Sequence, residues 1–186
     1  MSGNDIDTLL SKQACTELVH KLARGLDRCD KPLLLSLFHA DATDDHGGFK
    51  GSAAEFVDWA LGVLVTMERT QHLIGNVLVD VQGDHAVSEA YFMANHDMAD
   101  ADGKPVRMIA AGRYLDRFER RDGVWKIAHR HAVYDWNANF DRTDTWDRSP
   151  SSPRVFGERG QGDPIYAHVA SLDNGNKANS KIGVMA

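Results

Sequence analysis

The chain has 186 residues, of which 42% are hydrophobic and 26% charged, and its formal net charge at pH 7 is −6. These values are typical of one globular domain with its own core. The acidic balance argues against a nucleic-acid partner, and no apolar run approaches the ~20 residues that a membrane span requires. The two cysteines indicate no disulfide framework, and the first residues carry no secretion signal, so we expect a reduced, cytoplasmic protein.

The first third of the chain has the apolar spacing of three helices. Apolar residues recur every three or four positions in the first of them. Pro32 is suited to the first turn of a second helix, and Ser52 with Glu55 forms the capping box of a third. The expected helices cover residues 5–28, 33–38 and 52–65, with a loop or short strand over 41–51.

From residue 72 onward the pattern changes to the alternation of strands, interrupted by turn signals at 82–85 and 120–123. Helices followed by an antiparallel meander predict an α+β fold, in which N-terminal helices pack on a curved, mainly antiparallel sheet to form a cone. This domain is expected to span residues 1–140. An irregular C-terminal extension, residues 141–186, should follow, with disorder over 174–180. The expected strands cover residues 72–81, 86–98, 106–119 and 124–136.

Asp27 and His72 are the main candidates for chemistry. Asp27 lies near the end of the first helix and His72 at the start of the first long strand, so both should lie near the mouth of the cone. A carboxylate that holds a neutral imidazole in one tautomer makes a general base at neutral pH. The alternatives are a solvated carboxylate at a helix end and a structural histidine.

Several segments resemble the SnoaL-like branch of the nuclear-transport-factor-2-like superfamily, over about residues 5–137. Asp27 with His72 is similar to the dyad of scytalone dehydratase, hexachlorocyclohexane dehydrochlorinase and bile-acid dehydratase. In those enzymes the histidine abstracts a proton, and a hydroxyl or halide leaves from the neighbouring carbon without a cofactor. The segments that carry the resemblance are Leu26-Asp27-Arg28-Cys29-Asp30, residues 37–42, Asp45-His46-Gly47, Gly51, His72 and residues 118–127.

Arg130 corresponds to the pocket arginine of the dehydrochlorinase. Because a buried charge is costly unless paired, we expect Arg130 to pair with Asp27 or with an anionic or phenolic substrate. A structural Arg–Asp ion pair is the alternative. Two positions depart from the relatives: Leu22 replaces a Lys or Tyr, and Ala94 stands near a second carboxylate of the bile-acid enzyme. The substrate therefore does not carry over.

The resemblance also assigns the faces of the strands. It implies inward positions at 92, 94 and 96, at 110, 112 and 114, and at 128, 130, 132 and 134. Asp44, Asp45 and His46 with His72 are residue types that bind divalent metals, but they lack a strict ligand spacing, so we expect no metal and no other cofactor. The expected substrate-binding residues are His46, Phe92, His96, Tyr114 and Tyr134.

The opposite face of the sheet is expected to carry apolar residues that form an interface. The predicted outward residues are Trp125, Ile127, Val133, His129 and His131, and the resemblance implies a homo-oligomer, a trimer before a dimer. We therefore expect a cofactor-independent lyase, of the dehydratase type, acting on a small apolar cyclic or aromatic substrate. A cofactor-free carbon–carbon lyase or isomerase, a non-catalytic binding protein and a helper like the small subunit of dioxygenases remain alternatives.

Overall fold

The structure, a computed structural model, describes residues 3–180 and the side chains of residues 5–172. The chain forms two compact units, and the boundary falls between Thr143 and Asp144, where the sequence predicted 140/141. The second unit contains a short 3-10 helix η1 (Gly160–Gly162) and α4 (Pro164–Ser180). The first unit contains α1 (Gly3–Arg28), α2 (Lys31–Ser36), β1 (Phe38–Asp45), β2 (Lys50–Ser52), α3 (Ala53–Leu64), β3 (Arg69–Gln82), β4 (His85–Ala99), β5 (Pro105–Arg121) and β6 (Val124–Asp141).

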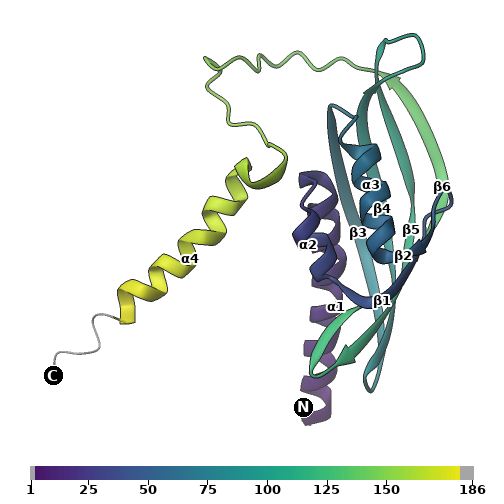
Figure 1. The fold of residues 1–186 in the computed structure, drawn as a ribbon, viewed down its shortest axis with the longest axis vertical. Helices are drawn as coiled ribbons and strands as arrows, with labels where there is room; N and C mark the ends of the chain where they lie inside the picture. The colour runs from purple at the N-terminus through teal and green to yellow at the C-terminus, as the bar shows by residue number, and fades with distance from the viewer. Residues whose placement is uncertain (1–2, 181–186) are drawn as a thin grey trace. The chain divides into compact units, whose positions relative to one another are not determined.

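The helices α1, α2 and α3 lie along one face of the sheet in the first unit (Figure 1). Helix α1 ends in a Schellman motif, in which Cys29 takes a left-handed conformation (φ 50°) and the Asp30 N–H donates to Gly25 O at 2.9 Å. The Asp30 carboxylate then caps α2 by accepting from Leu33 N at 3.0 Å. This sharp reversal places Asp27 in the last turn of α1.

The sheet has six strands in the order β2-β1-β6-β5-β4-β3, all antiparallel except the pair β1 and β6. The four predicted strands are present and longer than expected. The predicted second helix was wrong at its end, because Phe38 starts β1, where it pairs with Ile127 of β6 and is buried. The turn between β5 and β6 has positive φ at Asp122 (52°) and Gly123 (78°), the conformation of a type I′ hairpin.

Strand β6 contains a bulge at Ala128, because Phe118 of β5 pairs with Ile127 while Arg117 pairs with His129. One extra residue restarts the alternation of faces, so Ile127 and Arg130 point to the same side. Trp125 and Ile127, which were predicted to face outward, are instead buried against the helices, with exposed fractions of 8% and 0%. That prediction was wrong because the bulge is not visible in the alternation.

The inner face of the sheet carries small residues near the middle of β4 and β5. Ala94 of β4 pairs with Ala110 of β5, and Phe92 pairs with Gly112. A Cβ atom at Gly112 would lie 2.0 Å from the carbonyl oxygen of Val133, so only glycine allows β6 to approach β5 here. The large core side chains lie elsewhere on this face and on the helices, and include Val19, Leu22, Leu26, Phe56, Val57, Phe118 and Ile127.

The second unit is not irregular throughout, because α4 covers the segment that was predicted to be irregular and then disordered. Asp163 caps this helix through Ile165 N (3.1 Å), and Pro164 follows the cap as a first-turn residue. Residues beyond Ser180 lie outside the described residues. No helix in the described part of the chain combines the length and apolarity needed to cross a membrane.

Candidate active site

Asp27 and His72 form a hydrogen-bonded dyad. The Asp27 Oδ1 lies 2.7 Å from His72 Nδ1, and its Oδ2 accepts the backbone N–H of His72 at 2.8 Å. The side chains are only 10% and 6% exposed, respectively. Burial raises the pKa of Asp27, but hydrogen bonds and charge from His72, with Thr70, outweigh it and hold this pKa below its usual value. An ionised carboxylate accepts a hydrogen bond from Nδ1–H, and in that tautomer the lone pair of the ring is on Nε2.

The second ring nitrogen of His72 is unbonded. Nε2 makes no hydrogen bond to another described residue, and it is not fully enclosed, although the side chain is only 6% exposed. Asp27 occupies the last turn of α1, where the negative end of the helix dipole disfavours a carboxylate. The position is thus poor for helix stability, and it suits the orientation of an imidazole that acts as general base.

His96 lies beside this dyad without a carboxylate of its own. Its ring centroid is 5.8 Å from that of His72, with the planes at 86°. Burial, followed by repulsion from His72, lowers the pKa of His96 to about 4, so the ring is neutral at pH 7. His96 therefore adds no second positive charge beside the base.

Arg130 pairs with Asp116 and not with Asp27, so the expected pairing with Asp27 was wrong. Its Nε and Nη2 donate to Asp116 Oδ1 and Oδ2, each at 2.7 Å, and both side chains are 0% exposed. The guanidinium also stacks on the ring of Tyr114 at 4.1 Å. Asp116 is the direct partner of Arg130 across β5 and β6, whereas both oxygens of Asp27 are already bonded to His72.

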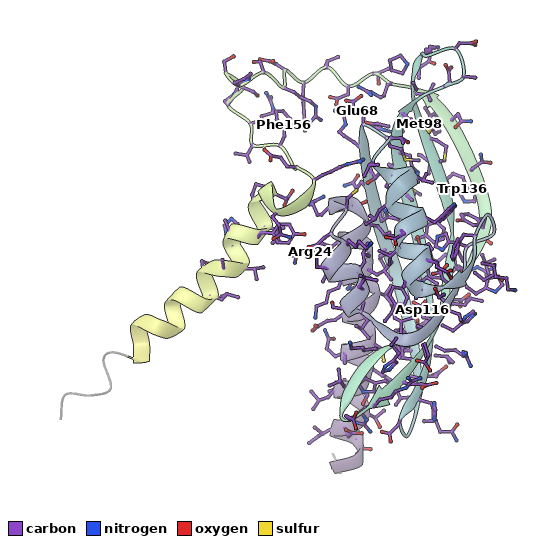
Figure 2. All side chains as sticks on the ribbon, in the orientation of Figure 1. Arg24, Glu68, Met98, Asp116, Trp136 and Phe156 are labelled. Carbon is purple, nitrogen blue, oxygen red and sulfur yellow. The ribbon has the colours of Figure 1, made fainter. Side chains whose placement is uncertain are left out.

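This arrangement is the structural ion pair that the sequence left as an alternative. The sequence analysis missed Asp116, although strand alternation from Tyr114 placed it on the inner face. In Figure 2, Asp116 lies well along the sheet from Glu68 and Met98, which mark one end of the unit. The charge of Arg130 is thus neutralised in the core, and the site has no free guanidinium at this position.

Three of the predicted substrate-binding residues form an aromatic wall. Phe92 stacks on Tyr114 with centroids 4.2 Å apart, and Tyr134 meets Phe92 edge-on at 6.0 Å. Burial raises the pKa of both tyrosines above the ordinary value, so each phenol stays protonated at neutral pH. Tyr114 is buried, with only 2% of its surface exposed, and its hydroxyl makes no hydrogen bond to another described residue.

His46 joins the same wall from the turn after β1. Its Nδ1 lies 3.1 Å from Oδ1 of the buried Asp44, and its ring stacks on Phe56 at 4.7 Å. The ring centroids of Tyr114 and Tyr134 are 5.9 and 6.2 Å away. From the sequence Asp44 was considered only as a metal ligand, and its contact with His46 was not predicted, because His46 lies in the turn after β1 rather than in the strand.

The residues considered as metal ligands do not converge. Among residues 3–180, no three or more His, Cys, Asp or Glu side chains are grouped around a common point that could hold an ion. Asp45 pairs with Lys50 at 3.0 Å, and His72 is bonded to Asp27.

Solved structures share this fold at low sequence identity. A hexachlorocyclohexane dehydrochlorinase, LinA type 2, is 23% identical with a TM-score of 0.69, covering 78% of this chain and 99% of its own. A candidate scytalone dehydratase from Novosphingobium aromaticivorans is 20% identical with a TM-score of 0.63, covering 84% and 97%. A Mycobacterium tuberculosis protein of unknown function is 22% identical with a TM-score of 0.59, covering 92% and 90%. At these identities the likeness establishes the fold alone.

A search of curated proteins found no match. The sequence profile of the SnoaL-like domain, in contrast, matches residues 7–131, which include most of α1, the dyad, the whole of β5 with Asp116, and the part of β6 that carries Arg130. The predicted family is confirmed, and with it the predicted class of fold: helices on a mainly antiparallel sheet. The chain belongs to the SnoaL-like domain family.

Proposed function

We propose that this protein is a cofactor-independent lyase that eliminates a leaving group from a small cyclic or aromatic substrate, with His72 as the base. The dyad carries the proposal: Asp27 holds His72 by one hydrogen bond to the ring Nδ1 and one to the backbone N–H, while Nε2 makes no hydrogen bond to another described residue. Nε2 takes a proton from a carbon next to a carbonyl, and Asp27 stabilises the imidazolium that forms. Two proteins of similar fold, the hexachlorocyclohexane dehydrochlorinase and the candidate scytalone dehydratase, are named for elimination reactions, which supports elimination as the reaction type.

The aromatic wall supplies the other requirement of this reaction. Removal of the proton places negative charge on the carbonyl oxygen of the substrate, and a donor aimed at that oxygen stabilises it. Tyr114 and Tyr134 are protonated phenols beside Phe92, whose ring offers an apolar surface to a planar substrate. Phe92 and these tyrosines thus bind the ring, and the phenols polarise the carbonyl.

The alternatives make different use of the same parts. A carbon–carbon lyase or isomerase would also need the base, but it would release a carbon fragment or nothing. A binding protein would return its ligand unchanged, and a helper subunit has no use for an accessible base held by a carboxylate. The accessible Nε2 of His72 therefore favours an enzyme, and the products distinguish the reactions.

The test uses 3-hydroxy-1-tetralone, a bicyclic β-hydroxy ketone that loses water to give 1-naphthol, which is followed by its absorbance. We expect turnover by the natural protein and a fall of ~10²–10⁴-fold in kcat/KM for His72→Asn, whose amide nitrogen replaces Nδ1 but not Nε2. His20→Gln, on the exposed side of α1, is the control and should retain full activity. No product from the natural protein, or equal rates for natural protein and His72→Asn, would overturn the proposal.

We also propose that the protein is a homo-oligomer, a trimer before a dimer, joined through the outer face of the sheet. This face keeps the predicted His129, His131 and Val133, while Trp125 and Ile127 are in the core instead. Exposed apolar side chains that are grouped on one face, as here, are typical of an interface between protein chains. Light scattering that finds only a particle of 20.6 kDa would contradict it. The exposed apolar residues of this face include Leu73, Val87, Tyr91, Met93 and Leu115.

A further inference from the structure

We propose that Asp44 and His46 form a second dyad, which serves as the general acid of the proposed lyase and makes its leaving group a hydroxyl. The proposal rests on the proposed function, since an acid is needed only if His72 acts as the base. It assigns to the site a dehydration of hydroxylated, uncharged ring ketones.

The first observation is the cost of placing Asp44 where it lies. Its side chain is fully buried, Oδ1 is within reach of His46 Nδ1, and Oδ2 has no hydrogen-bond partner among the described residues. Asp44 is also the register partner of Arg130 across β1 and β6, but the hydrogen bonds that Arg130 makes go to Asp116, and its buried Nη1 has no hydrogen-bond partner among the described residues. A buried carboxylate with an oxygen that lacks a hydrogen-bond partner lowers the stability of the folded protein. Its effect is to hold the imidazole of His46 in one orientation.

The second observation is the surroundings of His46. The ring stacks on Phe56, with the planes at 27°, and lies within 6.4 Å of the rings of Trp59, Tyr114 and Tyr134. Aromatic faces attract a cation, and so does the Asp44 carboxylate, so the site suits an imidazolium. The Nε2 atom of His46 has no partner in the described part of the chain and is not enclosed. A proton held there is available to a ligand.

The third observation is that the two histidines enter the inner face of the sheet from opposite sides. His72 lies on the edge strand β3 and pairs with Ala94, while His46 contacts Tyr134 of β6, whose partner is Gly112. Three strand spacings, about 14 Å, separate β3 from β6. Between them the sheet presents the small residues at 94, 110 and 112. A substrate over this floor must place its two neighbouring reacting carbons between His72 and His46, with the rest of the ring system to one side.

The chemistry follows from this placement. His72 Nε2 removes the proton next to the carbonyl, the electron pair forms the new double bond, and the neighbouring carbon–oxygen bond breaks. The departing hydroxyl takes the proton from His46 Nε2 and leaves as water, and a proton returns from His72 to His46 through solvent. Hydroxide is a poor leaving group and requires this proton, whereas chloride leaves as an anion without one. Arg130, fully enclosed and bonded to Asp116, is not accessible to serve a departing anion.

The test compares two leaving groups on one carbon skeleton. With 3-hydroxy-1-tetralone, His46→Asn should lower kcat/KM by ~10²-fold or more, because the amide keeps a donor to Asp44 but has no acid at the position of Nε2. With 3-chloro-1-tetralone, after subtraction of spontaneous elimination, the same variant should remain within a few-fold of the natural protein. Both ketones give 1-naphthol, so one assay serves for both.

The pH profile gives an independent readout. The natural protein should show a bell-shaped dependence of kcat/KM for the hydroxy ketone, and His46→Asn should lose its alkaline limb while keeping the acidic limb. Equal losses for the two leaving groups, or an unchanged alkaline limb, would reject the acid role of His46. If His72→Asn abolishes turnover while His46→Asn has no selective effect, the proposed lyase stands and this inference fails. If the natural protein converts neither ketone, the proposed function itself fails.

Discussion

Two pairs, Asp27–His72 and Asp116–Arg130, have similar hydrogen-bond distances, and our proposal gives them opposite uses. In each, both oxygens of one aspartate accept hydrogen bonds of 2.7–2.8 Å from a single residue. Arg130 carries a permanent charge and is 0% exposed, whereas the ring of His72 keeps one nitrogen without a hydrogen-bond partner among the described residues. Pairing with a carboxylate therefore does not by itself identify a catalytic group. The feature that distinguishes His72 from Arg130 is a second nitrogen that is not fully enclosed.

The largest effect is expected for Asp27→Asn. An amide at this position cannot stabilise the imidazolium of His72 and can turn the ring into the wrong tautomer, so we expect kcat/KM for 3-hydroxy-1-tetralone to fall by ~10³–10⁴-fold. The fold should be kept, because the amide still accepts one hydrogen bond from His72. A folded Asp27→Asn variant with activity near that of the natural protein would show that Asp27–His72, like Asp116–Arg130, is a structural pair.

The next effect concerns stability rather than turnover. Asp116→Ala leaves the charge of Arg130 buried and unpaired, so urea titration should show a loss of ~3–5 kcal/mol in the free energy of unfolding. The double variant Asp116→Leu with Arg130→Met removes both charges and should recover most of that loss. If the double variant is stable but inactive on the hydroxy ketone, Arg130 takes part in catalysis and the distinction between the pairs is lost.

His96 tests what happens to a histidine on this face without a carboxylate. Its pKa of about 4 in the folded protein lies below the ~6.5 of an unfolded chain, so between these values the unfolded state binds more protons. The free energy of unfolding must therefore fall as the pH drops from 6.5 to 4, by at most ~3 kcal/mol. Replacement by leucine should remove this slope in urea titrations at pH 7 and pH 4.5. The lowered pKa of Asp27 acts below about pH 4 and leaves this window unaffected.

The smallest effect is expected for an exposed pair of similar geometry. Arg121 donates to both oxygens of Asp41, at 2.7 and 3.2 Å, but both side chains are in contact with solvent. Solvent and salt screen such pairs, so Asp41→Asn should leave the urea midpoint and the turnover of the hydroxy ketone unchanged. A clear shift would mean that hydrogen-bond geometry, and not burial, sets the energy of pairs in this protein.

The sequence predicted the parts of this site that follow from regular periodicity. Asp27, His72 and the inward positions of β4 and β5 lie where helix and strand alternation, read with the family pattern, placed them. The faces of Trp125 and Ile127 were not predictable, because the bulge at Ala128 depends on the pairing of β5 with β6.

The partners of two other residues were also missed, for a related reason. Asp44 lies in β1, which pairs with β6, far away in sequence, as well as with β2, and His46 lies in the turn that follows β1. The bond between Asp116 and Arg130 likewise joins residues that are neighbours only across the β5–β6 ladder. Long-range pairing, which a local pattern does not contain, decides both.

The proposed acid lies in the turn between β1 and β2, whereas the proposed base lies on a long strand. His46 is followed by Gly47, at φ 72°, and Gly48, and its N–H closes the turn on Phe49 O at 2.8 Å. A surface turn accepts inserted residues far more readily than a long strand such as β3, which carries His72. Residues inserted into this turn would shift His46 while His72 keeps its position. Laboratory evolution of the turn length is therefore a way to change the distance between the two imidazoles and to fit larger or smaller rings.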